Sequence, residues 1–212
     1  MEAVMLFVLP SSKRQSKMGK QVWMPREESK RLVECFDVGG YALPRYMRFK
    51  NYFWDSLEFW VLPPPVQKRI VENSLVLCPL LGLAKVDEPI PYYSFGWEDE
   101  CKGVKVKEYW RIKERTREAL KDRDIVLFVG RKELALLDTS LARRVVRFEY
   151  YKKGKKVKND QRHKAYTLRY IAEWNLKLED FNKINFFDYQ VADVVEKGKN
   201  MIFILHAEGR YI

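Results

Sequence analysis

Two lysines and two carboxylates are the residues of this chain whose types and positions best fit chemistry. Lys13 follows the first apolar run directly, in Pro10-Ser11-Ser12-Lys13, and Lys50 follows a mixed aromatic and basic run. A desolvated lysine can act as nucleophile or base, and Asp87 or Glu133 could relay its protons. Ligands of open α/β sheets bind beyond the carboxyl ends of the strands, so we expect these residues there. The alternative is that they only form turns.

Several other chemistries lack the residues that they need. The chain has no glycine-rich nucleotide loop, no Gly-Lys-[Ser/Thr] and no Gly-x-Ser-x-Gly elbow, so we expect no ATP, NAD or other cofactor. Its two histidines, His163 and His206, lie 43 positions apart and fit no metal pattern. The three cysteines, Cys35, Cys78 and Cys101, form no Cys-x-x-Cys pair. We therefore expect neither a metal site nor a disulfide.

The positive charge of the chain is concentrated between Arg143 and Arg169. That segment holds eleven basic and two acidic residues, which accounts for +9 of the net charge of +11. Such a concentration favours an anionic partner, most often a phosphate backbone. We expect nucleic acid to contact Lys13, Lys50, Arg143, Arg144, Lys152, Lys153, Lys155, Lys156, Arg162, Lys164 and Arg169. The main alternative is a solvated face, because charged residues make up 33% of the chain and thermostable proteins carry many surface ion pairs.

Strand-like and helix-like segments alternate along the chain, which predicts a mixed sheet with flanking helices. The predicted strands are Val4–Leu9, Leu75–Cys78, Ile125–Val129, Val145–Tyr151 and Met201–Leu205. The predicted helices are Lys30–Phe36 (capped by Ser29), Pro65–Asn73, Glu108–Arg123, Lys132–Ala142 and Lys164–Trp174. We expect one α/β domain over residues 1–212, with a possible internal boundary at Pro63-Pro64-Pro65.

Two further segments have a clear local character. Pro89–Trp97 is rich in proline and aromatic residues and predicts an extended, exposed loop that forms a lid or an interface. Tyr151–Val157 predicts a hairpin with lysines at its tip. No apolar run is long enough for a membrane span, and the opening run Ala3–Leu9 favours a buried strand over a signal peptide. We expect a cytoplasmic protein that binds no membrane; its oligomeric state stays open.

Six stretches in this order resemble the YaaA family of peroxide-stress-resistance proteins, which bind DNA. They are Pro10-Ser11-Ser12-Lys13, Arg48-Phe49-Lys50-Asn51, Leu77–Asp87 followed by Pro91-Tyr92, Phe128–Leu134, Gln161-Arg162-His163-Lys164-Ala165, and Ile184–Tyr189. In the family these stretches carry Ser-Pro-Ala-Lys, Ala-Phe-Lys-Gly-Asp, Leu-Ser-Gly-Leu-Tyr-Gly, Asn-Leu-Ala-Ser-x-Glu-Tyr, Lys-Lys-Ala-Arg-Gly and Phe-Asn-x-x-Gly-Tyr. The chain is therefore similar to a shortened, divergent member of the family.

The resemblance implies a YaaA-like fold whose basic cleft is lined by Lys13, Lys50, Arg162 and Lys164. It also places Pro91, Tyr92 and Asn185 in loops near that cleft. Family members carry a longer helical insert between the two lysines, with a helix-hairpin-helix-like element, whereas only 36 residues separate Lys13 from Lys50 here. The element is thus reduced or missing, and the basic segment from Arg143 to Arg169 would substitute for it.

Three functions fit these observations. The first is a nucleic-acid-binding protein, with DNA favoured over RNA, that protects DNA under oxidative stress as the resemblance implies. The second is an enzyme that acts on nucleic acid or a nucleobase through a cleft lysine. The third is an interaction protein whose basic face docks an acidic partner. The order given is our order of preference.

Overall fold

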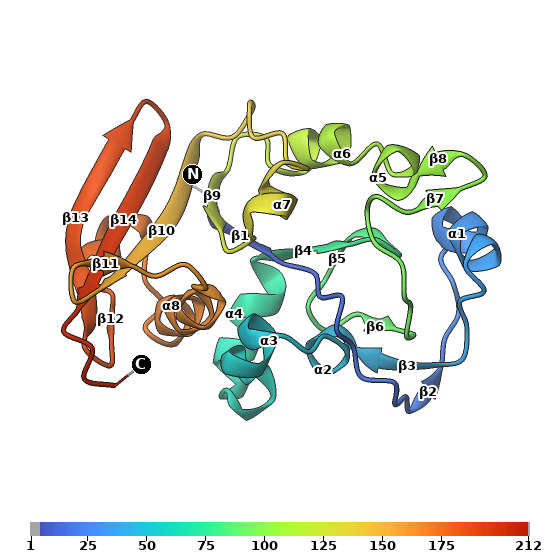
Figure 1. The fold of residues 1–212 in the computed structure, drawn as a ribbon, viewed down its shortest axis with the longest axis horizontal. Coiled ribbons are helices and arrows are strands. Elements are labelled where there is room, and N and C mark those ends of the chain that lie inside the picture. The colour runs from blue at the N-terminus through green and yellow to red at the C-terminus, as the bar shows by residue number, and fades with distance from the viewer. Residues whose placement is uncertain (1–4, 212) are drawn as a thin grey trace.

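The computed structural model describes residues 5–211, which form a single α/β domain around a mixed nine-stranded sheet. Figure 1 shows the sheet and the helices around it. The strand order of the sheet is β12-β13-β14-β10-β9-β1-β4-β5, with β11 paired to β10. Strands β14, β10, β9, β1 and β4 run parallel to one another, while β5, β11, β12 and β13 each pair antiparallel with a neighbour. The predicted α/β fold class is confirmed.

The strands of this sheet are β1 (Met5–Leu9), β4 (Ser74–Cys78), β5 (Gly82–Ala84), β9 (Asp124–Leu127), β10 (Arg144–Lys152), β11 (Lys155–Lys156), β12 (Asn185–Phe186), β13 (Tyr189–Lys197) and β14 (Asn200–Ala207). The helices are α1 (Lys30–Cys35), α2 (Arg45–Arg48), α3 (Tyr52–Leu57), α4 (Pro64–Glu72), α5 (Val106–Tyr109), α6 (Ile112–Ala119), α7 (Arg131–Leu134) and α8 (Gln161–Glu173). Three 3-10 helices span Glu27–Ser29, Phe59–Val61 and Leu178–Lys183.

All five predicted strands form, with ends shifted by one or two residues. The apolar runs of β1, β4 and β9 are continuous because parallel strands at the centre of a sheet are covered on both faces. β9, for example, is buried along its whole length. Val4 lies outside the described residues, so the start of the first predicted strand is not compared. β13 has no counterpart among the predictions, because its charges, such as Asp193 and Glu196, interrupt the apolar pattern on a mostly exposed edge strand.

The helices follow the predictions less closely. α8 and α4 match, and the Pro63-Pro64-Pro65 run proves to be the start of α4, which packs against α8. The predicted helix Glu108–Arg123 is divided into α5 and α6 by Arg111, whose φ of 49° is left-handed and interrupts the helical hydrogen bonds. The predicted helix Lys132–Ala142 is only the single turn α7, and the side chain of Ser29 makes no capping bond.

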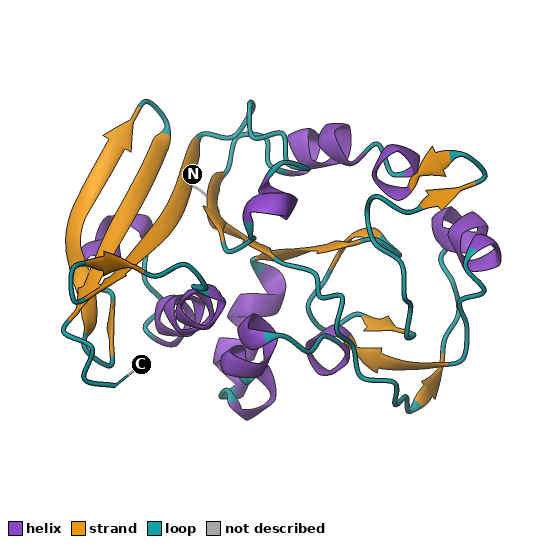
Figure 2. Cartoon of the chain, viewed as in Figure 1, coloured by secondary structure: helices purple, strands orange, loops and turns teal. Residues whose placement is uncertain are grey.

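An arm with short strands extends from β1 and carries the small sheet β2 (Gln21–Val22), β3 (Tyr41–Pro44) and β6 (Pro89–Ile90). Figure 2 shows that loops make up much of this part of the chain. Buried Arg48 holds the arm by donating to the carbonyls of Ser16, Met18, Tyr41 and Ile90. A single guanidinium thus satisfies four backbone acceptors in a region with few ladder hydrogen bonds.

The expectation of no disulfide is wrong, because Cys35 of α1 is bonded to Cys101 of the hairpin β7 (Glu100–Cys101) and β8 (Val104–Lys105). The two Cα atoms are 5.8 Å apart, within the usual range for a disulfide. Figure 1 shows α1 beside this hairpin at the outer end of the arm. The pairing could not be predicted from cysteine spacing because the partners are 66 positions apart and meet only in the folded chain. Cys78 is buried and free.

Opening the Cys35–Cys101 bond is expected to lower the free energy of unfolding by about 4 kcal/mol, because the cross-link restricts the unfolded chain over a long loop. Urea unfolding of the oxidised and reduced protein measures the difference. The double variant Cys35→Ser, Cys101→Ser should unfold at the same urea concentration as the reduced wild type, and reductant should not change its midpoint. Equal midpoints for oxidised and fully reduced protein would contradict this expectation.

Candidate functional site

Lys13 and Lys50 come together through backbone contacts at the end of β1. The hydroxyl of Ser12 donates to the carbonyls of Arg14 (2.7 Å) and Lys50 (3.2 Å), and the Lys50 amide donates to the Arg14 carbonyl at 2.9 Å. Gln15 and Phe49 form a β-bridge beside these bonds. Two lysines separated by 36 residues in sequence are thus held on adjacent backbone segments, and both are exposed.

Helix α3 is fixed against the same loop by two side chains. The Asn51 side chain caps α3 by accepting from the Trp54 amide at 3.0 Å, and its Nδ2 donates to the Ser11 carbonyl at 3.3 Å. The buried indole of Trp54 donates to the Pro10 carbonyl at 3.0 Å. These bonds set the position of Tyr52, whose ring is 56% exposed in the first turn of α3.

Glu133 joins the end of β1 to α7, the turn of helix that follows β9. Its carboxylate accepts from the Ser11 amide at 3.1 and 3.2 Å and from the Ser11 hydroxyl at 3.0 Å. Burial raises the pKa of Glu133 to about 7, and the hydrogen bonds from Ser11 oppose this shift without cancelling it. At neutral pH this carboxyl is therefore present in both its protonated and its ionised form, as proton transfer requires.

Helix α8 brings Lys164 and Arg162 to the same edge of the sheet. The Lys164 ammonium lies 3.2 Å from the Val129 carbonyl and 3.1 Å from the Asp160 carboxylate, and its side chain is 14% exposed. The Arg162 guanidinium lies over the Tyr52 ring, 5.7 Å from its centroid. The four residues predicted to line a cleft, Lys13, Lys50, Arg162 and Lys164, therefore gather around Ser11, Asn51 and Tyr52.

A shallow cavity of about 190 Å³ lies beside these residues and is lined by Tyr52, Asn159, Arg162 and His163. The Nε2 of His163 is 3.0 Å from the Tyr189 hydroxyl, which fixes the ring. Burial lowers the pKa of His163, so the imidazole is neutral at pH 7. No local sequence pattern connects Tyr52, His163 and Tyr189, because they come from α3, α8 and β13.

The predicted basic segment is divided between two edges of the sheet by β10. Arg144 begins this strand and Lys152 ends it, and nine extended residues span about 30 Å. The lysines of the β10–β11 hairpin, Lys152, Lys153, Lys155 and Lys156, therefore lie at the end of β10 away from Arg143 and Arg144. The expectation that both groups widen a single basic surface is corrected by this geometry.

Acidic residues from outside the segment also neutralise part of its charge. Arg143 and Arg144 both pair with Asp124, and Arg169 pairs with Glu58 at 2.9 Å and Glu173 at 3.5 Å. Within the segment, Lys156 pairs with Glu149 at 2.8 Å. Counting charges along the sequence missed Asp124, Glu58 and Glu173 because tertiary packing supplies them.

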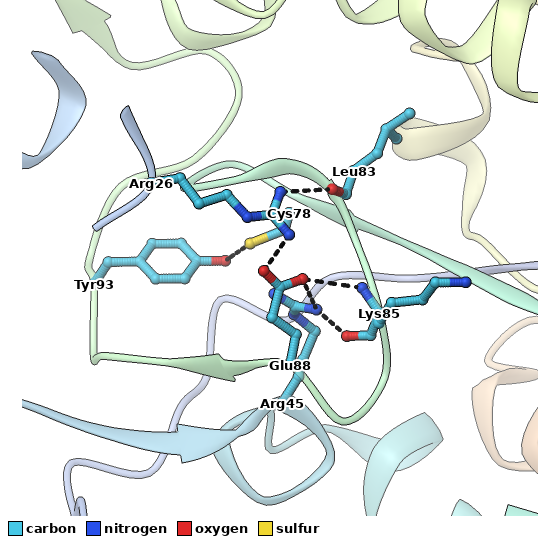
Figure 3. Close-up of polar contacts among 7 residues, drawn as sticks. All are labelled: Arg26, Arg45, Cys78, Leu83, Lys85, Glu88 and Tyr93. Atoms are coloured by element: carbon cyan, nitrogen blue, oxygen red, sulfur yellow. Dashed lines mark hydrogen bonds and ion pairs between the residues drawn. The ribbon is translucent and has the colours of Figure 1, made fainter. Parts of the chain in front are cut away.

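Asp87 does not join the site in the way that the sequence analysis expected. It is exposed before β6, and the neighbouring Glu88 makes the ion pairs there, with Arg26 and, at 4.0 Å, with buried Arg45. Figure 3 shows this group together with the Tyr93 hydroxyl, which lies 3.7 Å from the Cys78 sulfur. Burial raises the pKa of Tyr93 well above its usual value, so the phenol is neutral.

The aromatic segment is packed rather than exposed. Tyr93, Phe95 and Trp97 are buried at alternate positions, as in an extended chain lying against a core, while Tyr92 is 38% exposed with the Lys17 ammonium 5.9 Å from its ring centroid. Pro91 is buried as well. The prediction of an exposed lid or interface is thus wrong for most of this segment. Asn185 is exposed beside α8 and donates to the Tyr170 hydroxyl at 3.2 Å.

Neither the family models nor the curated proteins that were compared with this chain give a match. Within residues 5–211 no helix is long and apolar enough to cross a membrane. In the same residues no group of three or more histidine, cysteine, aspartate or glutamate side chains is arranged to hold a metal ion.

Glu133 is expected to make the protein less stable as the pH rises from about 4.5 to about 7. Its pKa is raised in the folded state, so folding favours the protonated form, and that advantage is lost as the pH passes the folded pKa. The loss is about 3 kcal/mol at most. Urea unfolding at pH 5 and pH 8 measures it, and Glu133→Gln should remove most of the difference. The same pH dependence in Glu133→Gln and wild type would contradict the assignment.

Proposed function

We propose that this protein binds nucleic acid, DNA in preference to RNA, across the carboxyl edge of its central sheet. The observation that carries the proposal is the convergence there of Lys13, Lys50, Arg162 and Lys164 from three separate segments. The lysine-rich hairpin β10–β11 lies at the same end of β10. Phosphates neutralised by these side chains would supply affinity with little sequence information.

Tyr52 supports contact with bases as well as with phosphates. Its ring is exposed at the edge where the basic residues gather, and Arg162 lies over one face. Exposed aromatic rings beside arginine and lysine are typical of proteins that stack bases of single strands. The buried aromatics nearby, Phe49, Phe53 and Trp54, belong to the core and are not available for stacking.

The proposal includes the YaaA-like role, protection of DNA under oxidative stress in the cytoplasm. Four stretches that carry the resemblance contribute Lys13, Lys50, Glu133 and Lys164, and these come from different elements to one edge of the sheet. Convergence of that kind is what a shared binding site requires. Disulfides such as Cys35–Cys101 occur inside hyperthermophile cells as well as in oxidising compartments, so the bond is compatible with a cytoplasmic location.

The triple variant Lys13→Ala, Lys50→Ala, Arg162→Ala is expected to flatten the salt dependence of DNA binding. Each phosphate contact contributes about 0.9 to the log–log slope for duplex DNA, so the slope should fall by about 2 to 3 units. Fluorescence anisotropy with duplex and single-stranded DNA and with RNA, over a series of salt concentrations, measures it. The matched control is Lys197→Ala, because Lys197 ends β13 beside the start of β14, at the opposite edge.

An unchanged slope in the triple variant would place nucleic acid elsewhere on the protein. Absence of binding to every nucleic acid at low salt would reject the proposal, and the basic face would then fit an acidic protein partner. A loss of binding free energy in Lys197→Ala as large as one third of the loss in the triple variant, which removes three charges, would indicate a non-specific effect of net charge.

Glu133 favours a second candidate, an enzyme that acts on nucleic acid or a nucleobase. The carboxyl is half-buried, bonded to the Ser11 hydroxyl and able to exchange a proton near neutral pH. Lys13 and Lys50 fit the role of a nucleophile less well than the sequence suggested. Both are exposed, whereas activation of a lysine amine by desolvation requires burial. Lys164 is mostly buried but engaged with Asp160 and Val129.

A covalent or hydrolytic reaction is expected to depend on Glu133 more than binding does. Duplexes with an abasic site or a modified base are incubated with the protein, with and without borohydride, and resolved on denaturing gels. In Glu133→Gln any cleavage or adduct should fall at least about tenfold, while the anisotropy binding curve stays within twofold of wild type. The second candidate is rejected if wild type gives neither product with any of these duplexes.

A further inference from the structure

The edge of the sheet opposite the proposed interface contains a cavity of about 470 Å³. It lies where β1, β9 and β10 begin and where α4 and α8 end, and its polar lining includes Arg69, Asp124, Arg143 and Arg144. None of these residues belongs to the site around Ser11 and Glu133. The cavity is therefore a separate feature of the fold.

Two guanidinium groups are held in place in this cavity by a single carboxylate. Asp124, whose side chain is 5% exposed, accepts from Nε of Arg143 at 2.8 Å and from Nε and Nη2 of Arg144 at 3.0 and 2.8 Å. Burial alone would raise the pKa of Asp124, but the hydrogen bonds from both arginines outweigh it and hold the pKa below its usual value. One ionised carboxylate thus faces two cations and leaves a net positive charge.

The arrangement also leaves hydrogen-bond donors available. A guanidinium has five N–H donors, and these bonds to Asp124 occupy the Nε and Nη2 side of each arginine. The Nη1 groups of Arg143 and Arg144 make no bond to Asp124. The two side chains are 43% and 44% exposed. The pair is consequently oriented by Asp124 and still accessible to a ligand.

Arg69 adds a third cation from α4. Its Nη1 donates to the Ala172 carbonyl at 2.9 Å, in the last turn of α8, which fixes the side chain at the cavity wall. Among the described residues no carboxylate pairs with Arg69. The other charged residues of the lining that the structure describes are Lys177 and Glu179.

The rest of the lining consists of apolar side chains together with Asn73 and Asn175. Phe7, Ile171, Leu176 and Leu178 contribute to it, together with Met5. A cavity with guanidinium groups and apolar walls suits a molecule that has an anionic group on an apolar body, because each part finds a matching surface. A purely structural ion pair would need only Asp124 and one arginine, and would leave the second arginine unexplained.

We propose that this cavity binds a small organic anion, in which a phosphate or carboxylate group attached to an apolar or aromatic body is held by Arg69, Arg143 and Arg144. The site is independent of the nucleic-acid interface. The anionic group would contact the free Nη donors, where arginine forms paired hydrogen bonds with planar carboxylates and with phosphates. The apolar body would cover the side chains of Phe7 and Leu178.

Isothermal titration with phenyl phosphate, benzoate and inorganic phosphate tests the proposal on the whole protein. We expect saturable binding of phenyl phosphate or benzoate, weaker binding of inorganic phosphate, and a loss of about tenfold or more in Arg69→Gln. Tighter binding of phenyl phosphate would identify the anionic group as a phosphate, and tighter binding of benzoate would identify it as a carboxylate. Lys197→Ala is the control for net charge and Arg162→Ala for the nucleic-acid interface, and both should bind like wild type.

NMR spectra of the arginine Nε–Hε groups provide a test that needs no variant. On titration with the tighter-binding compound, the signals of Arg143 and Arg144 should shift together, with the same dissociation constant as in calorimetry. Absence of saturable binding of phenyl phosphate and benzoate would overturn the proposal, as would affinity unchanged in Arg69→Gln. Because Arg162→Ala and the DNA assays address the other edge, failure here leaves the proposed function standing.

Discussion

The parallel pairing of β1 between β4 and β9 is the constraint on which the rest of the structure depends. Val8 pairs with Leu75 on one side and with Leu127 on the other, so all three strands end at the same edge. Whatever follows each strand is therefore brought together, which is why Ser11 meets Glu133 although the two are 122 positions apart. The buried strands themselves need only apolar side chains, and the chemistry lies in the loops that follow them.

The direction of β10 separates the positive charges of the segment from Arg143 to Arg169. The strand carries its arginines at one end and its lysines near the other. At the first end, a buried aspartate holds two arginines beside a cavity, and at the second the lysines extend into a hairpin turn. The same excess of positive charge thus supports two different surfaces, one suited to a small anion and one to an extended polyanion.

The irregular arm depends on polar contacts more than on regular secondary structure. Buried Arg48 satisfies four carbonyls, Arg45 reaches the Lys85 carbonyl and Glu88, and the Cys35–Cys101 bond closes the outer end. Figure 3 shows how the Arg45 and Glu88 side chains lie between neighbouring loops. Buried charged groups of this kind are costly to leave unpaired, so they fix the loop positions that the short strands alone would not.

The sequence by itself determined the fold class, the five predicted strands, α4 and α8, because these follow from local hydrophobic periodicity. It also identified Lys13, Lys50, Arg162, Lys164 and Glu133 as residues of interest. Only the tertiary structure decided that these five share one edge, that Arg143 and Arg144 lie at the other, and that Cys35 is bonded to Cys101. Each of these outcomes joins residues far apart in sequence, and contacts of that kind are set by strand order and packing, which no local pattern encodes.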